Sequence, residues 1–297
     1  MSSANSSPYR VVAASVRDGR SIRFAVEYLS PMSTSVFLPG LLKGKSALVT
    51  GGGSGIGAGI AKRLAEQGAR VALVGRTLEK LENVAQEIRK AGGEASTHPC
   101  DVREYPKVED VVNAAAALHA GLDVIVNSAA GNFLAPASAL SANGFRSVVD
   151  IDLCGTFNVS RAAFAHLMKS RGQIVNITAT QASVPTPLQC HAGAAKAGIE
   201  KLTRDLALEW GRFGVRVNAI APGPIDDTEG MKRLAPADAE TKLKKRVPLE
   251  RWGSIFEICE AVTFLVSPSA TYVTGATLLV DGGTSLLGGG AFEGAFG

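Results

Sequence analysis

One short segment concentrates glycines in a pattern suited to binding a phosphate. Gly51–Gly57 reads GGGSGIG, follows the apolar run Ser46–Thr50 and leads into a helical pattern at Ile60–Glu66. Glycines let a backbone approach a pyrophosphate closely, and a helix start offers unpaired N–H groups and the positive end of the helix dipole. The segment predicts a dinucleotide site. Its expected binding residues are Gly51, Gly53, Ser54, Gly55, Ile56 and Gly57.

A second position predicts which dinucleotide is bound. After the next apolar run, residues 71–74, the chain reads Gly75-Arg76-Thr77 and contains no acidic residue. An acid there would hold the ribose hydroxyls of NAD and repel a 2′-phosphate, whereas Arg76 can pair with that phosphate. The sequence therefore predicts NADPH as the cofactor.

Short apolar segments alternate with helical patterns along most of the chain. The expected strands cover residues 46–50, 71–74, 95–98, 123–126, 173–177, 215–220 and 276–280. The expected helices cover residues 60–66, 78–90, 107–118, 142–169 and 190–211. This alternation is typical of a parallel sheet with helices on both faces. The predicted fold class is α/β, built as a single doubly wound domain.

Composition excludes several other classes of protein. A length of 297 residues, with 46% apolar and 20% charged residues, fits one large folded domain rather than a disordered chain. The net charge of +4 comes without a dense Lys/Arg block, which argues against a nucleic-acid partner. No apolar run approaches the length of a membrane span. The four cysteines lie far apart, so we expect no metal site and no disulfide framework.

The two ends differ in composition from the rest. Residues 1–31 are rich in Arg and Ser and poor in acids, which resembles a mitochondrial transit peptide; the alternative is a non-native extension ahead of Met32. Residues 284–297 form a Gly-rich tail or a partner-docking segment, and the last three are not a peroxisomal signal of the SKL type. We therefore expect an extension (1–31), a nucleotide-binding domain (32–283) and a tail (284–297). The predicted location is mitochondrial or cytoplasmic.

Several motifs in the same order resemble the short-chain dehydrogenase/reductase family, over about residues 41–283. Besides the glycine loop, they are Cys100-Asp101-Val102, Asn127–Gly131 (NSAAG) and Asn218–Ile225 (NAIAPGPI). The resemblance implies a Rossmann-type sheet of seven parallel strands and a homotetramer. It assigns cofactor contacts to Asp101, Val102, Asn127, Ala129, Gly131, Lys196, Pro222, Gly223 and Ile225.

The catalytic positions depart from the usual family pattern of a Ser and a Tyr-x-x-x-Lys pair. Lys196 matches the family lysine, but Ala192 and Ala179 stand where the Tyr and Ser are expected. Asp152 occupies the position of a family asparagine. This departure resembles the 2,4-dienoyl-CoA reductases of the peroxisomal type. In that subgroup the equivalents of Asp152 and Lys196 are implicated in catalysis, and a further aspartate looks like Asp281.

The resemblance implies NADPH-dependent reduction of 2,4-dienoyl-CoA to 3-enoyl-CoA in the β-oxidation of unsaturated fatty acids. Hydride added at C5 sends negative charge to the thioester oxygen, where a positive field from Lys196 lowers the barrier. Asp152, together with Asp281 if the fold brings it near, could orient a water that protonates the α-carbon. The substrate is then an acyl-CoA. The expected pocket residues are Asn132, Phe133, Thr178 and His191.

Two alternatives remain open at this point. The first is another oxidoreductase of the same family, above all a trans-2-enoyl-CoA reductase. The second is a catalytically silent nucleotide-binding protein, in which loss of the Ser and Tyr means loss of activity.

Overall fold

The structure is a computed structural model that describes residues 9–12, 25–28, 35–228 and 240–287. The chain divides into two units, Met1–Leu38 and Pro39–Gly297. In the first unit, strands β1 (Tyr9–Val12) and β2 (Ala25–Tyr28) pair antiparallel. Most of the predicted N-terminal extension, and residues 288–297 of the predicted tail, lie outside the described residues.

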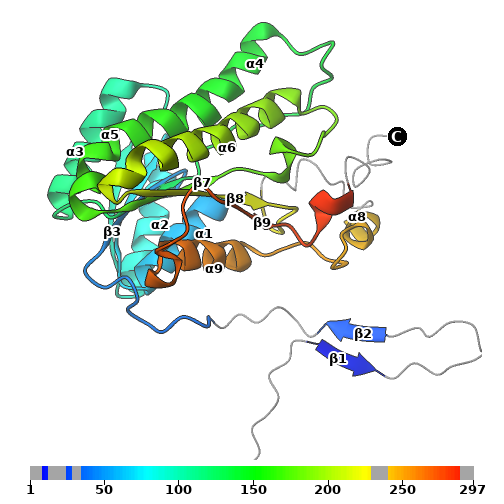
Figure 1. Ribbon diagram of the computed structural model, residues 1–297, viewed down its shortest axis with the longest axis horizontal. Coiled ribbons are helices and arrows are strands. Elements are labelled where there is room, and N and C mark those ends of the chain that lie inside the picture. The colour runs from blue at the N-terminus through cyan, green and yellow to red at the C-terminus, as the bar shows by residue number, and fades with distance from the viewer. Residues whose placement is uncertain (1–8, 13–24, 29–34, 229–239, 288–297) are drawn as a thin grey trace, which may run out of the picture. The chain divides into compact units, whose positions relative to one another are not determined.

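Seven parallel strands form the sheet of the second unit (Figure 1). Their spatial order is β5-β4-β3-β6-β7-β8-β9, so the chain first builds outward from β3 to β5 and then returns to β6 on the other side of β3. The strands are β3 (Ser46–Thr50), β4 (Arg70–Gly75), β5 (Glu94–Pro99), β6 (Val124–Asn127), β7 (Gln173–Ile177), β8 (Arg216–Pro222) and β9 (Thr277–Val280). The predicted α/β class and the seven-stranded sheet are confirmed. Such a reversal of strand order opens a crevice at the carboxyl ends of the strands.

Helices cover both faces of this sheet. One layer contains α1 (Gly55–Glu66), α2 (Leu78–Lys90) and α9 (Ile255–Val266). The other contains α3 (Tyr105–Leu118), α5 (Gly155–Ser170) and α6 (Cys190–Trp210). Two shorter helices are α4 (Ala142–Val149), which packs against α6, and α8 (Glu240–Arg246). Figure 1 shows α5 and α6 on one side of the sheet and α9 on the other.

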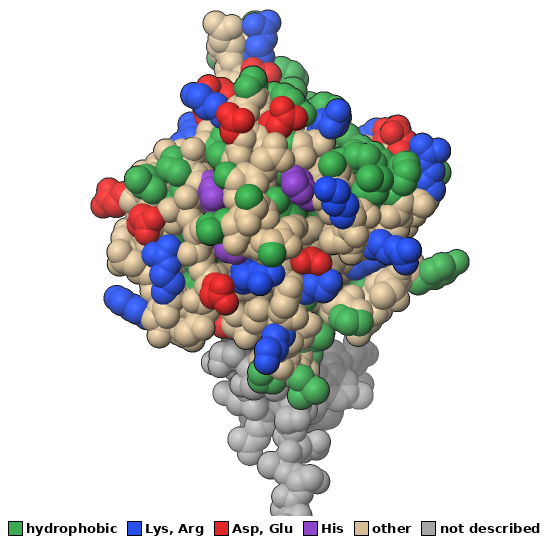
Figure 2. All heavy atoms as spheres, turned by 90° about the vertical axis from the view of Figure 1, so that its left-hand side faces the viewer, with side chains coloured by type: hydrophobic (Ala, Val, Ile, Leu, Met, Phe, Trp, Pro, Cys, Tyr) green, Lys and Arg blue, Asp and Glu red, His purple; other side chains and the backbone are tan. Residues whose placement is uncertain are grey.

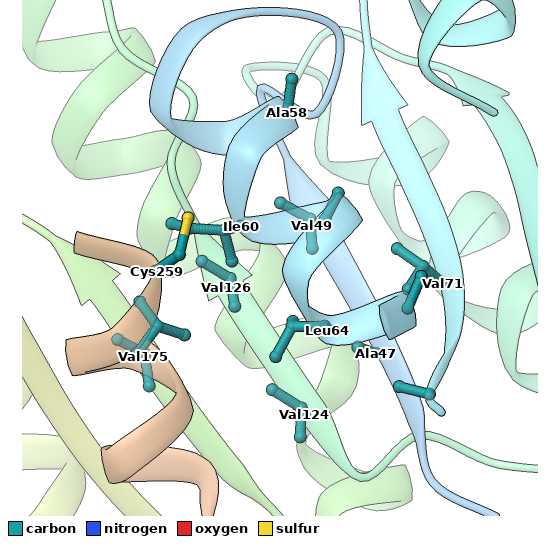
Figure 3. Packing of buried hydrophobic residues seen from close by; sticks show 14 of the residues in the cluster. Ala47, Val49, Ala58, Ile60, Leu64, Val71, Val124, Val126, Val175 and Cys259 are labelled. Atoms are coloured by element: carbon teal, nitrogen blue, oxygen red, sulfur yellow. The ribbon is translucent and has the colours of Figure 1, made fainter. Parts of the chain in front are cut away.

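Alternating side chains of the central strands supply the two larger cores. On β3, Ala47 and Val49 join the core under α1 and α9, whereas Leu48 joins the core under α3, α5 and α6. Figure 3 shows the first of these cores, where Ile60 and Leu64 of α1 lie over Val124 and other valines of the sheet. All of these side chains are buried. Because helices cover both faces of the sheet, its strands are buried on both sides and are apolar on both faces.

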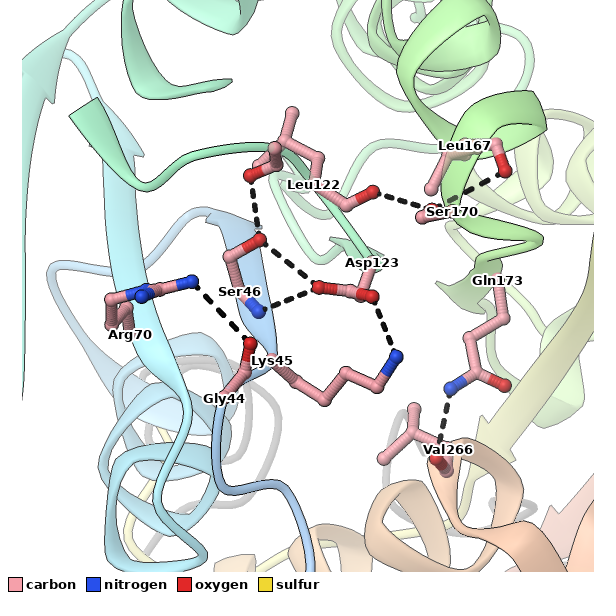
Figure 4. Close-up of polar contacts among 11 residues, drawn as sticks. Gly44, Lys45, Ser46, Arg70, Leu122, Asp123, Leu167, Ser170, Gln173 and Val266 are labelled. Atoms are coloured by element: carbon pink, nitrogen blue, oxygen red, sulfur yellow. Dashed lines mark hydrogen bonds and ion pairs between the residues drawn. The ribbon is translucent and has the colours of Figure 1, made fainter. Parts of the chain in front are cut away.

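A polar cluster fixes the edge of the sheet at which β3, β6 and β7 begin (Figure 4). The Asp123 carboxylate accepts hydrogen bonds from the backbone N–H of Ser46, at 3.0 Å, and from Lys45 Nζ, at 2.8 Å. Nearby, Ser170 Oγ donates to the carbonyl of Leu122, and Gln173 Nε2 donates to that of Val266. These bonds tie the starts of the central strands to each other and to α5 and α9.

The surface carries mixed charge. On the face drawn in Figure 2, acidic and basic side chains are interspersed and apolar side chains lie between them. Among the residues that the structure describes, no helix is both long enough and apolar enough to cross a membrane.

Two expected helices differ from the structure. Helix α1 already begins at Gly55, because the loop glycines enter the helix instead of preceding it. The expected continuous helix over 142–169 is interrupted by a π-helical turn at Asp150–Cys154, between α4 and α5. A π turn contains one more residue than an α-helical turn, and the pattern of polar and apolar residues does not reveal this insertion.

The contact between α1 and α9 depends on Gly59. A Cβ atom there would collide with Cγ2 of Ile255. We therefore expect Gly59→Ala to lower the free energy of unfolding, since overpacking costs about 1–3 kcal/mol and exceeds the ~1 kcal/mol that alanine gains over glycine within a helix. Urea denaturation measures the change.

Gly211 provides the matched control, because a Cβ atom there meets nothing within 4 Å. Gly211→Ala should leave stability unchanged or raise it by about 0.4–1 kcal/mol. Equal effects of the two alanines would contradict close packing at Gly59.

Candidate active site

A cleft of about 480 Å³ lies at the carboxyl ends of the strands. Gly51 follows β3, Gly75 ends β4, Ser128 follows β6, Thr178 follows β7, and Pro222 ends β8; all five line the cleft. The cleft therefore spans the point where the strand order reverses, at which open α/β sheets bind their ligands.

The glycine loop forms a backbone cradle at the floor of the cleft. Gly51 has a φ of +66°, and a Cβ atom there would stand 2.7 Å from the carbonyl oxygen of Ser128. A Cβ atom at Gly57 would collide with the carbonyl of Gly51. The side chain of Ser54 does not cap α1, and no acidic residue stands in its first turn. The first-turn amides of α1 thus remain available to an anion, as the pyrophosphate of a dinucleotide requires.

Basic side chains stand near the end of β4. Arg76 is exposed and lines the cleft together with Lys80 of α2. Within the described part of the chain, the Arg76 guanidinium has neither a hydrogen-bond nor an ion-pair partner. On the next strand end, Arg103 hydrogen-bonds the Asp101 carboxylate at 2.6–3.1 Å and thereby lowers the pKa of Asp101. An unpaired arginine beside a dinucleotide cradle suits an additional phosphate.

A buried ion pair joins Asp152 to Lys196. One oxygen of the Asp152 carboxylate, Oδ2, lies 3.0 Å from Lys196 Nζ; the other, Oδ1, accepts the backbone N–H of Gly131 at 2.7 Å. The Asp152 side chain is 1% exposed and that of Lys196 10%. Lys196 Nζ also donates to the carbonyl of Ile177, and Lys196 reaches the cleft. Such a pair is tolerated in the interior only when its remaining polar atoms are also bonded, as they are here.

The π turn sets the position of Asp152 against α6. Thr156 Oγ1 donates to the carbonyl of Asp152 at 2.6 Å, and Thr178 Oγ1 donates to the carbonyl of Lys196 at 3.2 Å. The turn lies directly on α6, because a Cβ atom at Gly198 would stand 2.6 Å from the side chain of Leu153. Both partners of the ion pair are thus held through their backbones as well as their side chains.

A polar network beneath the cleft supports this arrangement. Asn127 Nδ2 donates to Ser160 Oγ and to Asn176 Oδ1, and Asn176 Nδ2 donates to Thr203 Oγ1. All four side chains are buried. The network ties β6 and β7 to α5 and α6, the helices that flank the π turn and Lys196.

Two positions near Lys196 carry methyl groups. Ala179 lines the cleft, and Ala192 is buried one helical turn before Lys196 on α6. Neither can donate a proton, and the neighbouring Thr178 hydroxyl is bonded to the carbonyl of Lys196. The cleft therefore offers a cation at this place without a side-chain hydroxyl acid at either alanine position.

His191 lies behind the aromatic ring of Phe133. The two ring centroids are 4.5 Å apart, and the imidazole is fully buried. Neither ring nitrogen has a hydrogen-bond partner among the described residues. Burial lowers the pKa of His191, although the backbone of Phe133 and the charge of Asp152 act in the opposite direction. A neutral imidazole under a half-exposed ring is suited to the wall of an apolar pocket.

Among the described residues, the Asp281 carboxylate bonds within its own turn and not to Asp152 or Lys196. It accepts the backbone N–H groups of Gly283, at 2.9 Å, and Ser285, at 2.8 Å. Although burial opposes them, these bonds lower the pKa of Asp281. A Cβ atom at Gly223 would stand 2.6 Å from the Cα atom of Asp281. Asp281 therefore closes a turn behind the cleft wall at Gly223.

Comparison with known proteins agrees with this geometry. Residues 51–285 match the family described as enoyl-(acyl carrier protein) reductase. A mouse protein named peroxisomal 2,4-dienoyl-CoA reductase, (3E)-enoyl-CoA-producing, is 46% identical over 252 residues, which cover 84% of this chain and 86% of the mouse protein. The chain belongs to the short-chain dehydrogenase/reductase family. Members of this family are oxidoreductases that use a nicotinamide cofactor.

Solved structures of the family share the fold. A citronellol catabolism dehydrogenase of Pseudomonas aeruginosa is 42% identical, with a TM-score of 0.75 over 84% of this chain and 99% of that one. A gluconate 5-dehydrogenase of Burkholderia cenocepacia, solved in complex with NADP and tartrate, is 34% identical. Its TM-score is 0.79 over 82% of this chain and 96% of that one.

The structure brings most of the predicted site residues of this family member to one cleft. The lining includes Gly51, Gly53, Ser54, Ile56, Gly57, Arg76, Asp101, Val102, Ala129, Asn132, Thr178, Lys196, Pro222, Gly223 and Ile225. The other predicted residues do not line the cleft: Gly55, Asn127, Gly131, Phe133, Asp152, His191 and Asp281. Of these, Asp152 is connected to the cleft by its ion pair with Lys196, and Gly131 by its hydrogen bond to Asp152.

The cleft lining also includes polar residues outside the predicted set, among them Lys80, Gln181 and Gln189. Lys80 lies four residues beyond Arg76 at the start of α2. Gln189 immediately precedes α6, seven residues before Lys196. Gln181 lies fifteen residues before Lys196, in a short 3₁₀ turn, Thr180–Ala182, that follows β7.

The ion pair predicts a test by double mutation. Asp152→Ala leaves the Lys196 ammonium buried without its acid partner, which should cost about 3–5 kcal/mol of unfolding free energy. Adding Lys196→Met should recover much of this loss, because no buried charge then remains. Urea denaturation of the two single variants and the double variant gives the coupling energy.

Asp205, which pairs with Lys201 on the exposed side of α6, is the matched control. Asp205→Ala should cost less than about 1 kcal/mol, as exposed pairs do. A coupling energy near zero between Asp152 and Lys196 would rule out the buried pair.

Proposed function

We propose that this chain is an NADPH-dependent reductase that converts 2,4-dienoyl-CoA to 3-enoyl-CoA. The observation that carries the proposal is a dinucleotide cleft in which the Asp152–Lys196 pair stands beside methyl groups at Ala179 and Ala192. The mouse relative named above as a 2,4-dienoyl-CoA reductase supports the same substrate class.

The chemistry of this reaction fits a site without a hydroxyl acid. Bound NADPH supplies a hydride, which C5 of the dienoyl chain accepts. Negative charge then spreads through the conjugated bonds to the thioester oxygen, and a proton added at C2 gives the 3-enoyl product. The acceptor carbon bears no oxygen, so no acid is needed where Ala179 and Ala192 stand. Reduction of a ketone would need one there.

Lys196 and Asp152 divide the remaining tasks. The Lys196 ammonium faces the cleft, where it can bind the ribose of the nicotinamide half and stabilise negative charge on the substrate. Asp152 fixes the direction of that ammonium through the 3.0 Å ion pair. We propose that a water held near this pair brings the proton to C2, as general acid catalysis through one water allows.

The unpaired Arg76 supports NADPH over NADH. Arg76→Ala should raise the KM for NADPH by about 10- to 100-fold, because a charge-assisted hydrogen bond contributes about 1.5–3 kcal/mol. The KM for NADH should change little, since NADH lacks the 2′-phosphate. Steady-state kinetics with both cofactors measure the two constants.

Arg89→Ala, which removes an exposed arginine near the other end of α2, serves as the control. An equal rise in KM for both cofactors in Arg76→Ala would count against a phosphate contact.

Parallel assays separate the proposed function from its alternatives. NADPH oxidation is measured with 2,4-dienoyl-CoA, trans-2-enoyl-CoA and 3-oxoacyl-CoA, and the dienoyl product is identified. We expect turnover of the dienoyl substrate to a 3-enoyl-CoA and little turnover of the 3-oxoacyl substrate. The Asp152→Ala/Lys196→Met chain is the folded control and should lack activity.

Each other result has a defined meaning. Robust 3-oxoacyl reduction would overturn the mechanism, because that substrate needs an acid at its carbonyl oxygen. Preferred turnover of trans-2-enoyl-CoA would favour an enoyl-CoA reductase. Absence of both NADPH oxidation and NADPH binding would leave the silent homologue.

Assembly and location extend the proposal. We propose a homotetramer, supported by exposed apolar side chains at Phe157 and Met168 of α5 and at Leu208 of α6; sedimentation velocity tests it. The mouse relative is named peroxisomal, whereas the Arg- and Ser-rich segment 1–31 predicts a mitochondrial or cytoplasmic location. Microscopy of the tagged full chain distinguishes these compartments.

A further inference from the structure

Three side-chain amides meet at one wall of the cleft. Gln189 Oε1 accepts hydrogen bonds from Asn132 Nδ2, at 2.6 Å, and from Gln181 Nε2, at 2.5 Å. All three residues line the cleft. They come from the loop after β6, the 3₁₀ turn after β7 and the residue preceding α6. The cluster therefore joins the three segments that surround the acyl end of the proposed site.

The geometry of Gln189 leaves its amide nitrogen for the cleft. Its carbonyl oxygen points at the two donors, so the planar NH₂ group points elsewhere. The side chain is 2% exposed and does not cap α6. Among the residues that the structure describes, Gln189 Nε2 has no hydrogen-bond partner, and Gln181 Nε2 uses only one of its two hydrogens. Because both residues line the cleft, these N–H groups are available to an acceptor on a bound ligand.

Gln189 and Lys196 reach the cleft from different places along the chain. Gln189 immediately precedes α6, whereas Lys196 lies almost two helical turns into it, and both line the cleft. Ala192 and Gly193 lie between them and contribute no polar group. The cleft thus has a cationic end at Lys196 and a neutral amide end at Gln189.

We propose that Gln189 and Gln181 donate N–H hydrogen bonds to the thioester carbonyl oxygen of the bound acyl-CoA. This inference rests on the proposed function. The hydride-accepting carbon belongs beside the nicotinamide near Lys196, while the oxygen that receives the charge lies at the far end of the conjugated chain. We place that oxygen at the two glutamines, which line the same cleft as Lys196.

Amide donors also suit the outcome of the reaction. Hydrogen bonds that strengthen as charge develops on an oxygen lower the barrier. An amide N–H is far too weakly acidic to give up its proton, so it stabilises the oxygen without protonating it. The electron pair then returns to C2 and takes the proton there, which leaves the double bond between C3 and C4. The two glutamines would therefore favour the 3-enoyl product.

Substitutions separate donation from simple packing. Gln189→Glu keeps an oxygen that accepts the bonds from Asn132 and Gln181 but removes the N–H donor. Gln181→Leu removes the second donor. Each variant should lower kcat with 2,4-dienoyl-CoA by about 100-fold, the cost of losing one donor to an oxyanion. NADPH affinity should stay at its wild-type value in both variants, and Gln181→Leu, at a half-buried position, should also keep the wild-type thermal midpoint. Gln86→Glu makes the same change on the exposed face of α2 and should have no effect.

Infrared difference spectroscopy tests the contact without turnover. The full chain is mixed with NADP⁺ and a 2,4-hexadienoyl-CoA that carries ¹³C at the thioester carbonyl. A hydrogen-bonded carbonyl absorbs at lower frequency than the same carbonyl in water-free solvent. We expect the lowered band in the wild type and in Gln86→Glu, and a higher frequency in Gln189→Glu and Gln181→Leu.

The two experiments fail in different ways. An unshifted carbonyl band in the wild type, an identical shift in Gln189→Glu, or an unchanged kcat in both glutamine variants would overturn the inference. If the wild type binds the labelled substrate but oxidises no NADPH with it, the proposed function fails. The carbonyl band then still decides whether the glutamines bind the thioester oxygen.

Discussion

The candidate site depends on placing one carboxylate and one ammonium together in the interior. Burying either charge alone would cost several kcal/mol, so each makes the other tolerable. Neighbouring groups must be placed to serve this pair. The backbone N–H of Gly131 bonds to Asp152, and the carbonyl of Ile177 accepts a hydrogen bond from Lys196. The π turn holds Asp152 against α6. The polar network at Asn127 then holds the surrounding strands and helices in register. A large part of the polar interior is thus arranged around a single ion pair.

The two edges of the sheet have different roles. At the starts of the strands, Asp123 binds side chain and backbone groups of β3 and closes the sheet with ordinary structural contacts. At the ends of the strands, glycines and small residues replace such contacts and leave the cleft open. One edge therefore provides stability and the other provides binding, which is common when parallel strands converge on a ligand.

Sequence patterns were sufficient for the sheet and for the dinucleotide end of the cleft. Buried parallel strands are apolar on both faces, so a single sequence is enough to recognise them. A glycine loop between a strand and a helix can be recognised too, because close approach of a phosphate to the backbone requires glycines there. The Asp152–Lys196 pair was different: it came from family resemblance, because nothing in its spacing shows that a helix–helix contact brings the two charges together. The resemblance also points to Asp281, whose carboxylate accepts the backbone N–H groups of Gly283 and Ser285. Gln189 was overlooked because an amide neither titrates nor forms a recognisable motif.

The π turn at Asp150–Cys154 gives the site an unusual kind of sensitivity. Each residue of a regular helix advances the side chains by about 100° around the axis, so loss of one residue ahead of Asp152 would swing its carboxylate away from Lys196 by roughly that angle. The same deletion would leave α4 and α5 as one continuous, well-formed helix. Replacing side chains around the ion pair changes its interaction energy. Deleting or inserting a residue in the π turn instead changes the direction in which the Asp152 carboxylate points. In an evolving family, a single-codon insertion or deletion in this turn would therefore act as a switch between two site geometries on an unaltered scaffold.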